Sequence, residues 1–453
     1  MQNRIFTFMT QKIQLSDHFT YRKLLRFTIP SIIMMVFSSI YSIIDGIFVS
    51  NFVGKTPFAA VNLVMPFLMI LGVVGFMLGT GGSALVAKII GEGDRRKANS
   101  IFSMLVIFGL IIGAVLTIVC NLTIKDVVFF LGAKGEMVDM CILYGRIISF
   151  ALPLCTLQYM FQSMLITAER PTFALIVTII AGVLNIILDY LLIVVFHLGL
   201  SGAAIATAIS QVVGGLIPLI YFLLPNKSLL KITKAKFNIR ALIKVLYNGA
   251  SEFFANISSS ILAICYNYQL MKFFGENGVA AFGTIMYVQF IFAAIFIGYS
   301  MGVAPIVSYN YGSQNHKELK NVFSKNIKVI LSMGVLLTIC LELLAYPLTK
   351  IFVGYDAELF DLTRKAFMIY GLAYILIGFN GYASSFFTAL NNGAVSAFIA
   401  TSKALVFETS SVFVLPFLFG KDSIWFAVSV AEFLAMIMII FILIKYKSRY
   451  HYW

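Results

Sequence analysis

Three polar side chains interrupt apolar segments of the chain, where a charge or an amide is unexpected. Asp45 lies in the first of these segments, and Asn185 and Asp189 lie four residues apart in the fifth. At positions i and i+4, the latter two share one face of a helix. A carboxylate at membrane depth costs on the order of 3 kcal/mol by insertion scales, so it usually faces a cavity and marks a proton or ion path. The pattern therefore predicts a transporter.

The composition is typical of a protein that spans a membrane. Hydrophobic residues make up 60% of the 453 residues, charged residues make up 11%, and the mean hydropathy is +0.95. Soluble proteins are roughly 45–50% apolar and about 25% charged. Windows of about 20 apolar residues, enough to cross a ~30 Å hydrocarbon core, predict an all-α integral membrane protein with twelve transmembrane helices. Their approximate limits are 25–50, 60–88, 101–124, 138–165, 172–197, 202–224, 245–271, 279–308, 324–347, 366–390, 394–419 and 423–445.

The basic residues predict the orientation in the membrane, because cytoplasmic loops carry the excess of Lys and Arg. Of the 33 basic residues, 23 fall on the side that holds the N-terminus, 8 fall on the other side, and Arg146 and Lys403 lie inside spans. We therefore expect both termini in the cytoplasm and the protein in the cell membrane. The first 22 residues contain no apolar run with a cleavage site, so no signal peptide is expected. The net charge of +14 follows from the same bias and from contact with an anionic inner leaflet, and does not indicate nucleic-acid binding.

The chain resembles itself when it is shifted by 221 residues. Between residues 38 and 103, 15 of 66 positions match without a gap, including the glycine pairs Gly54/Gly275, Gly81/Gly302 and Gly91/Gly312. This predicts two pseudo-symmetric six-helix lobes, at 1–224 and 245–453, joined by a basic cytoplasmic linker at 225–244. Because six is even, both halves enter the membrane from the same face, so the repeat is parallel. Transporters built this way bind substrate between the halves, which rock to give alternating access.

Several sequence blocks, in this order, resemble the multidrug and toxic compound extrusion (MATE) family and fit its prokaryotic DinF-like branch best. The blocks are YSIIDGIFVS (41–50), VGKTPFAAV (53–61), GGSALVAKIIGEGD (81–94), LNIILD (184–189) and GLSGAAIATAISQ (199–211). The resemblance covers nearly all of the chain. It implies two V-shaped lobes and efflux of cationic or amphipathic organic compounds coupled to inward H⁺ or Na⁺. It also implies a cation-coupling site in the N-lobe, which maps to Asp45, Asn185, Asp189 and Thr207.

The spacing of these residues agrees with one shared site. At ~1.5 Å per residue, Asp189 lies roughly 15 Å and Thr207 roughly 12 Å from the turn near residue 199, while Asp45 lies roughly 10–13 Å from the turn at 52–54. Two carboxylates in one low-dielectric pocket repel each other, so a proton or a bound cation relieves the repulsion. The alternative is a structural role as an ion pair or as hydrogen bonds between helices. Pro30, fifteen residues before Asp45, predicts either a hinge that links the site to lobe movement or a tolerated kink.

The C-lobe sequence gives a less definite pattern. Glu408 and Glu432 each lie about twelve residues from the turn near residue 420, so they share a depth. They predict either a second acidic pair or, with Lys403 nearby, a cluster that neutralises itself. Glu252 follows Gly249-Ala-Ser in a pattern like that of the DinF-like branch, and a role in substrate binding or gating is a possible reading.

Three functional classes stay open at this stage. A secondary multidrug antiporter is favoured. A lipid-linked oligosaccharide flippase of the same broader superfamily usually has fourteen helices and a basic cavity. An integral-membrane enzyme would need clustered catalytic groups, whereas the four histidines fall outside the span centres. We therefore expect no enzymatic activity.

The expected partners follow from the favoured class. They are small organic cations or amphipathic drugs and the lipid bilayer, and we expect a monomer. There is no Walker A pattern, so ATP is not expected to drive export. We expect no cofactor other than the coupling ion, H⁺ or Na⁺, and no metal site beyond a possible Na⁺ at the coupling site.

The charge bias generates a first prediction about topology. A cysteine introduced at Arg95 or Lys234 should react with an impermeant thiol reagent only from the cytoplasm, and one at Lys55 or Lys421 only from outside. Labelling in intact cells and in inverted vesicles measures this. Reaction at Lys234 from outside would overturn the assignment.

Overall fold

The computed structural model describes residues 13–453, which contain helices and no strands. The helices of the first half are α2 (Tyr21–Phe48), η1 (Val49–Val53), α3 (Lys55–Gly91), α4 (Arg95–Phe130), α5 (Glu136–Thr167), α6 (Pro171–Asp189), η2 (Tyr190–Val195) and α7 (Gly199–Leu223). Those of the second half are α8 (Ile239–Gly312), α9 (His316–Val353), α10 (Ala357–Gly371), α11 (Tyr374–Ala389), α12 (Gly393–Thr401), η3 (Ser402–Glu408), α13 (Thr409–Phe419), η4 (Lys421–Phe426) and α14 (Ala427–Tyr450).

The predicted twelve-helix, two-lobe fold is confirmed, including the break between the predicted spans 245–271 and 279–308, and one detail, a bend inside a span, was not predicted. Ten continuous helices of the described residues are long and apolar enough to cross a membrane. One of them, α8, has 74 residues and would extend about 110 Å if it were straight, but Gly275 breaks it at φ 61° and ψ −146° into two spans. The predicted span at 366–390 is bent by 50° between α10 and α11.

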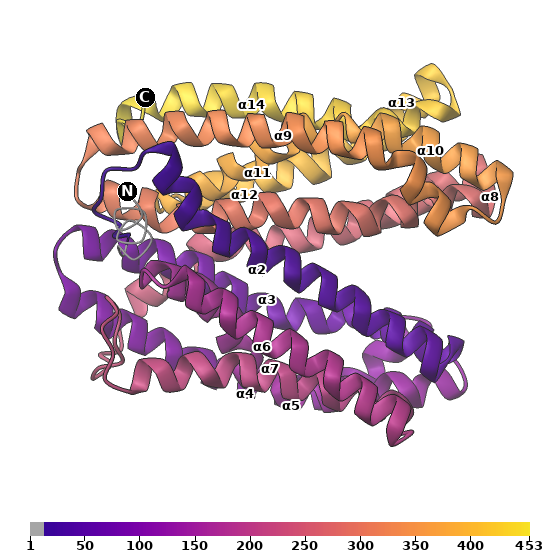
Figure 1. The fold of residues 1–453 in the computed structure, drawn as a ribbon, viewed down its shortest axis with the longest axis horizontal. Coiled ribbons are helices and arrows are strands. Elements are labelled where there is room, and N and C mark those ends of the chain that lie inside the picture. Colours follow the sequence, from indigo (N-terminus) through magenta and orange to yellow (C-terminus); the bar gives the residue numbers. More distant parts are fainter. Residues whose placement is uncertain (1–12) are drawn as a thin grey trace, which may run out of the picture.

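The two lobes appear as two layers of helices in Figure 1. Helices α3 to α7 form one layer, α8 to α14 form the other, and α2 runs obliquely between them. The segment before α2 and the C-terminus lie at the same end of the bundle, which we call the terminus end (Figure 1). The lobes converge there and diverge toward the far end. Each half has an even number of spans and therefore returns the chain to the side where it entered, which brings the C-terminus back to the terminus end.

The internal repeat is visible in the backbone at the turns. Gly54 and Gly275 both have positive φ, at 123° and 61°, and Gly199 and Gly420 have φ of 56° and 85°. Each pair is 221 residues apart. Glycine adopts such angles without the steric penalty of a Cβ atom, so the same residue type ends the same helices in both lobes. The helix starts repeat as well, because Asp94 and Asn315 cap α4 and α9 by accepting hydrogen bonds from Lys97 N and Glu318 N.

Residues 13–20 connect the lobes at the terminus end before α2 begins. The backbone N–H of Leu15 donates to Glu169 Oε1 of the N-lobe at 2.9 Å, and that of Phe19 donates to Glu318 Oε1 of the C-lobe at 2.8 Å. His18 Nδ1 lies 2.7 Å from Glu318 Oε2. Leu15 and Phe19 are fully buried. This short segment therefore contacts both lobes with backbone and side chain.

The connection between the lobes, residues 224–238, is extended and lies along α4. The backbone N–H groups of Lys231 and Thr233 donate to the side-chain oxygens of Asn99 and Ser103, at 3.1 and 2.8 Å. Polar side chains on α4 thus satisfy backbone groups that have no secondary structure of their own. The hydrogen bonds hold this connection against the N-lobe.

The lobes meet at the terminus end through glycines that bring two backbones into contact. A Cβ atom on Gly91 of α3 would lie 2.2 Å from the Tyr309 carbonyl oxygen of α8, and one on Gly312 of α8 would lie 2.0 Å from that of Lys88 on α3. The two contacts are equivalent under the repeat. Between the same lobes, Gly249 packs on Met77. We call these contacts the glycine seam.

The glycine seam generates a prediction. Gly312→Ala should separate the lobes at the terminus end, because the added methyl group overlaps a backbone carbonyl that cannot rotate away. Spin labels at Lys97 and Lys317, on a background without native cysteines, should report a longer distance by pulsed electron resonance. Gly283→Ala is the matched control, since a Cβ there has no neighbour within 4 Å. An unchanged distance in Gly312→Ala would contradict the assignment of the seam as the closing contact.

Candidate functional site

The four N-lobe residues singled out in the sequence lie together in the structure. They come from α2 (Asp45), α6 (Asn185 and Asp189) and α7 (Thr207). Thr207 Oγ1 donates to Asp45 Oδ1 at 3.4 Å, and Asp45 also interacts with Asn185 and Asp189. Asp189 is fully buried and Asn185 is 1% exposed. Asp45 is half-buried beside them, so two carboxylates share one site, which we call the N-lobe cluster.

The N-lobe cluster contains buried polar atoms without hydrogen-bond partners among the described residues. Neither carboxylate oxygen of Asp189 nor either polar atom of the Asn185 amide has a hydrogen-bond partner among the described residues. Burying such groups unpaired is unfavourable, by about 1–3 kcal/mol each and more for a charge. A proton on a carboxylate, or a hard cation held by carboxylate, amide and hydroxyl oxygens, satisfies this set. Residues 13–453 contain no group of three or more His, Cys, Asp or Glu placed to hold a metal ion.

Both carboxylates lie next to a π-helical turn. The segment η2 begins directly after Asp189, and η1 begins four residues after Asp45. A π turn widens the helix by one residue and is frequent at functional sites, where it changes the direction of side chains relative to a regular helix. The carboxylates thus lie where the regular helices of two different spans end.

The sequence did not identify two tyrosines beside the cluster. Tyr144 of α5 is 1% exposed and interacts with Asp45, Asp189 and Thr207, and Tyr41 of α2 interacts with Asp45. Tyr41 could have been found, because it lies four residues before Asp45 on the same helix face. Tyr144 gave no signal, since a sequence does not fix how α5 is rotated about its axis.

Glycine 182 allows α2 and α6 to approach each other at the cluster. A Cβ atom on Gly182 would lie 2.5 Å from the Phe37 ring and 2.8 Å from the Tyr41 ring. Because Gly182 is three residues before Asn185, the close approach occurs one turn away from the cluster. The packing of these helices brings Asp45 to Asn185 and Asp189.

Pro30 and Glu252 lie away from this cluster, near the lobe junction. Helix α2 continues through Pro30 without interruption. The adjacent Ile32 packs against Gly298 of the C-lobe, where an added Cβ would lie 2.6 Å from the Ile32 Cα. Glu252 is one turn beyond Gly249, which is part of the glycine seam. It is fourteen residues from Tyr266 along α8, or roughly 21 Å, so it does not join the other C-lobe glutamates.

The remaining C-lobe candidates form a cluster that contains its own cation. Lys403 Nζ lies 2.7 Å from Glu432 Oε1, and Asn380 Nδ2 donates to the Glu432 carbonyl at 2.8 Å. Glu408 interacts with Lys403 and with Tyr266. Glu408 and Glu432 are 7% and 2% exposed. The geometry matches the self-neutralising alternative rather than a bare acidic pair. We call this set the C-lobe cluster.

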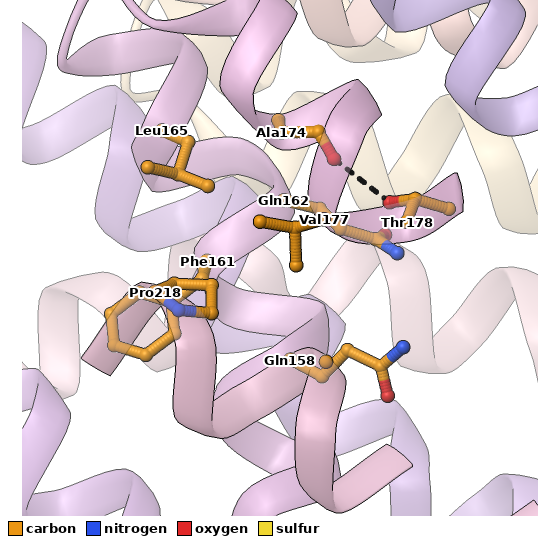
Figure 2. A pocket seen from close by; sticks show the side chains of 9 residues that line it. Gln158, Phe161, Gln162, Leu165, Ala174, Val177, Thr178 and Pro218 are labelled. Atoms are coloured by element: carbon orange, nitrogen blue, oxygen red, sulfur yellow. Dashed lines mark hydrogen bonds between the residues drawn. The ribbon is translucent and has the colours of Figure 1, made fainter. Parts of the chain in front are cut away.

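A small cavity lies within the N-lobe, between α5, α6 and α7 (Figure 2). The side chains of Gln158, Gln162 and Thr178 line it together with apolar groups, and Thr178 Oγ1 donates to the Ala174 carbonyl at 3.0 Å. Its volume of about 10 Å³ is room for a single water molecule. The two glutamines provide Oε1 atoms without protein partners, which such a water can satisfy. The cavity is too small for an organic substrate.

Comparisons with known proteins place the chain in a family. The MatE family profile matches residues 30–191 and, a second time, residues 253–414, so the chain belongs to the MatE family. It is a multi-pass membrane protein of this family of multidrug efflux transporters. The double match coincides with the two halves of the internal repeat. The DinF-like branch stays a prediction.

Curated relatives and solved structures agree with the family. The chain is 25% identical to the multidrug export protein MepA of Staphylococcus saprophyticus over 437 residues, which are 93% of this chain and 94% of the relative. It is also 25% identical to MepA of Staphylococcus aureus, over 95% and 94% of the two chains. A structure described as the outward-facing conformation of a multidrug resistance MATE family transporter superposes with a TM-score of 0.89, at 24% identity and over 95% and 96% of the chains. That likeness concerns the fold alone.

Proposed function

We propose that this protein exports cationic or amphipathic organic compounds and is driven by inward movement of H⁺ or Na⁺ through the N-lobe cluster. The observation that carries the proposal is the pair Asp45 and Asp189, which lies with Asn185 and Thr207 and in which both carboxylate oxygens of Asp189 have no hydrogen-bond partner among the described residues. An exchangeable cation supplies the missing positive charge. The ion gradient provides the free energy, so neither ATP nor an organic cofactor takes part.

The cation-loaded and cation-free states differ in the net charge of the N-lobe cluster, beside the C-terminal half of α2. Helix α2 carries Asp45 in the N-lobe cluster and, at its other end, contacts α8 across the lobe junction through Thr28 and Ile32. Pro30 lies between Thr28 and Ile32 and removes one backbone hydrogen bond from the helix. Loading of the cluster favours a different path of α2 at Pro30, and this hinge separates the lobes 1–224 and 245–453 at the glycine seam.

The substrate class follows from the relatives' function and from the side chains available. MepA proteins are named as multidrug exporters. The chain has 43 Phe and 19 Met residues, whose rings contact cations and whose flexible thioethers fit substrates of different shapes. The excess of basic residues on the side of the termini supports a cell-membrane protein with both termini in the cytoplasm. One chain contains both lobes and the site, so a monomer is sufficient.

Isosteric amides at the two carboxylates test the proposal. Asp45→Asn and Asp189→Asn should each insert and fold, because an amide preserves shape and hydrogen bonding, yet each should abolish gradient-driven export of a fluorescent cation from proteoliposomes. The double variant should be no worse than either single variant, since one functional unit is already broken. Drug binding in detergent should persist, while its competition by H⁺ or Na⁺ disappears.

The matched control is Asp422→Asn, an aspartate whose side chain is 52% exposed and pairs with Lys365 outside the cluster. It should transport like the unmodified protein. If both cluster variants are well expressed and still exchange ions for drug, the carboxylates serve only as links between helices and the proposal is wrong.

Glu252 is proposed to act on the substrate rather than on the coupling ion. It lies at the lobe junction, away from both clusters. Glu252→Gln should therefore change the relative export of cationic and uncharged drugs and leave the ion dependence intact. Transport assays with a panel of drugs at several pH values and Na⁺ concentrations measure both. Loss of all ion-coupled exchange in Glu252→Gln, with normal exchange in Asp189→Asn, would place coupling in the C-lobe.

A further inference from the structure

The two clusters occupy equivalent places in the two lobes. The turns at Gly54 and Gly275, and those at Gly199 and Gly420, relate the helices by a shift of 221 residues. Under this shift Asp45 corresponds to Tyr266. Tyr266 lies beside Glu408 in the C-lobe cluster, just as Asp45 lies beside Asp189 in the N-lobe cluster. The same three spans of each lobe therefore build both sites.

The carboxylates are distributed differently over the equivalent helices. In the N-lobe they lie on α2 and α6, whereas in the C-lobe they lie at the end of η3 (Glu408) and on α14 (Glu432). Glu408 is two residues from the position equivalent to Asp189, and Glu432 is equivalent to Gln211. Both sites thus hold two carboxylates, of which Asp45 is half-buried and the other three are buried. The two clusters therefore have the same number of acidic groups, but one of these groups lies on a different span in each lobe.

The decisive difference is a cation that belongs to the chain. Lys403 is equivalent to Gly182, which has no side chain and is covered by Phe37 and Tyr41. The Lys403 ammonium lies 2.7 Å from Glu432 Oε1 and interacts with Glu408. Among residues 13–453, no ammonium or guanidinium group is among the interactions of Asp45 or Asp189. Both clusters therefore have two carboxylates, but among the described residues only the C-lobe cluster also contains a positively charged side chain.

We propose that Lys403 is a tethered counter-cation, which takes in the C-lobe the place that an exchangeable H⁺ or Na⁺ takes in the N-lobe. This inference rests on the proposed coupling role of the N-lobe cluster. The ammonium is held covalently and cannot leave, so the C-lobe loads one cation fewer than its two carboxylates would otherwise accept. Ion coupling is thereby confined to the N-lobe, although the fold contains the place for a second site.

Removal of the ammonium should create a second cation site. Lys403→Met keeps most of the length of the side chain and removes its charge, which leaves two buried carboxylates without a counter-charge. The purified protein should then hold about one more monovalent cation per chain than the unmodified protein. Radioactive Na⁺ counts bound Na⁺, and a pH-indicator dye counts bound protons on the same sample. The sum of both is the measured quantity.

Two further variants make the count specific to charge. Lys403→Arg retains a positive charge and should hold the same number of cations as the unmodified protein. The double variant Lys403→Met/Glu432→Gln removes one carboxylate together with the ammonium, so its count should also return to the original value. Since a buried pair replaced at both ends is often tolerated, this variant keeps the test valid if Lys403→Met alone folds poorly. An additional cation in the double variant, or none in folded Lys403→Met, overturns the inference.

The Asp45→Asn background separates this inference from the proposed function. Asp45→Asn alone should lose a cation, and Asp45→Asn/Lys403→Met should regain one, now in the C-lobe. If Asp45→Asn loses none, the proposed coupling role of the N-lobe cluster fails, whatever the result at Lys403. If Asp45→Asn loses one and Lys403→Met adds none in either background, the N-lobe proposal stands and the tethered counter-cation is wrong. The melting temperature of Asp45→Asn/Lys403→Met should rise with Na⁺ or with acid, and that of Asp45→Asn should not.

Discussion

The arrangement of this protein depends on one constraint, that a buried carboxylate needs a compensating positive charge or enough hydrogen-bond donors. The C-lobe meets it within the chain, through Lys403 and Asn380 around Glu432. The N-lobe does not, because Asp189 and Asn185 have polar atoms without hydrogen-bond partners in the part of the chain that the structure describes. A structure of two similar halves is therefore electrostatically asymmetric. Such an asymmetry lets an ion-driven transporter bind its ion in one lobe only, because only one cluster lacks, among the described residues, a positive charge of its own.

The internal repeat also shapes the contact between the lobes, which consists of surfaces that can separate and close again. The glycine seam pairs Gly91 with Tyr309 and Gly312 with Lys88, two contacts that the repeat relates to each other. Backbone contact through glycine gives close packing without side chains that interlock, so such surfaces can separate without rotamer changes. Residues 13–20 add hydrogen bonds to Glu169 and Glu318 across the junction. Close packing of small residues and a few polar links hold the lobes together at the terminus end.

Much of this could be predicted from the sequence because membrane helices follow simple rules. Apolar windows located the spans, and the glycine pair Gly54 and Gly275 predicted the turn that divides α8. The four cluster residues could be placed at one depth from helical rise alone. The rotation of helices could not be predicted, and so Tyr144 was missed. The choice between an acidic pair and a neutralised cluster was also open, because residue spacing does not say whether Lys403 reaches Glu432. The bend between α10 and α11 follows Gly371, but a single glycine within an apolar run did not predict a bend there.

The position of α2 explains how a local change of charge can reach the lobe contact. This helix is the span that carries a cluster carboxylate, Asp45, and also packs extensively on α8 of the other lobe. The rest of the cluster lies on α6 and α7, which contact neighbours of their own lobe. In the proposed mechanism, an ion that binds between Asp45 and Asp189 would draw α2 toward α6, and the contacts of α2 with α8 would then have to accommodate the shift. A rigid α2 would transmit this movement along its whole length, whereas Pro30 lies where the helix meets α8 and lacks a hydrogen bond that would resist bending. The proline thus lies within the surface where α2 meets the other lobe, fifteen residues before Asp45 in the proposed coupling site.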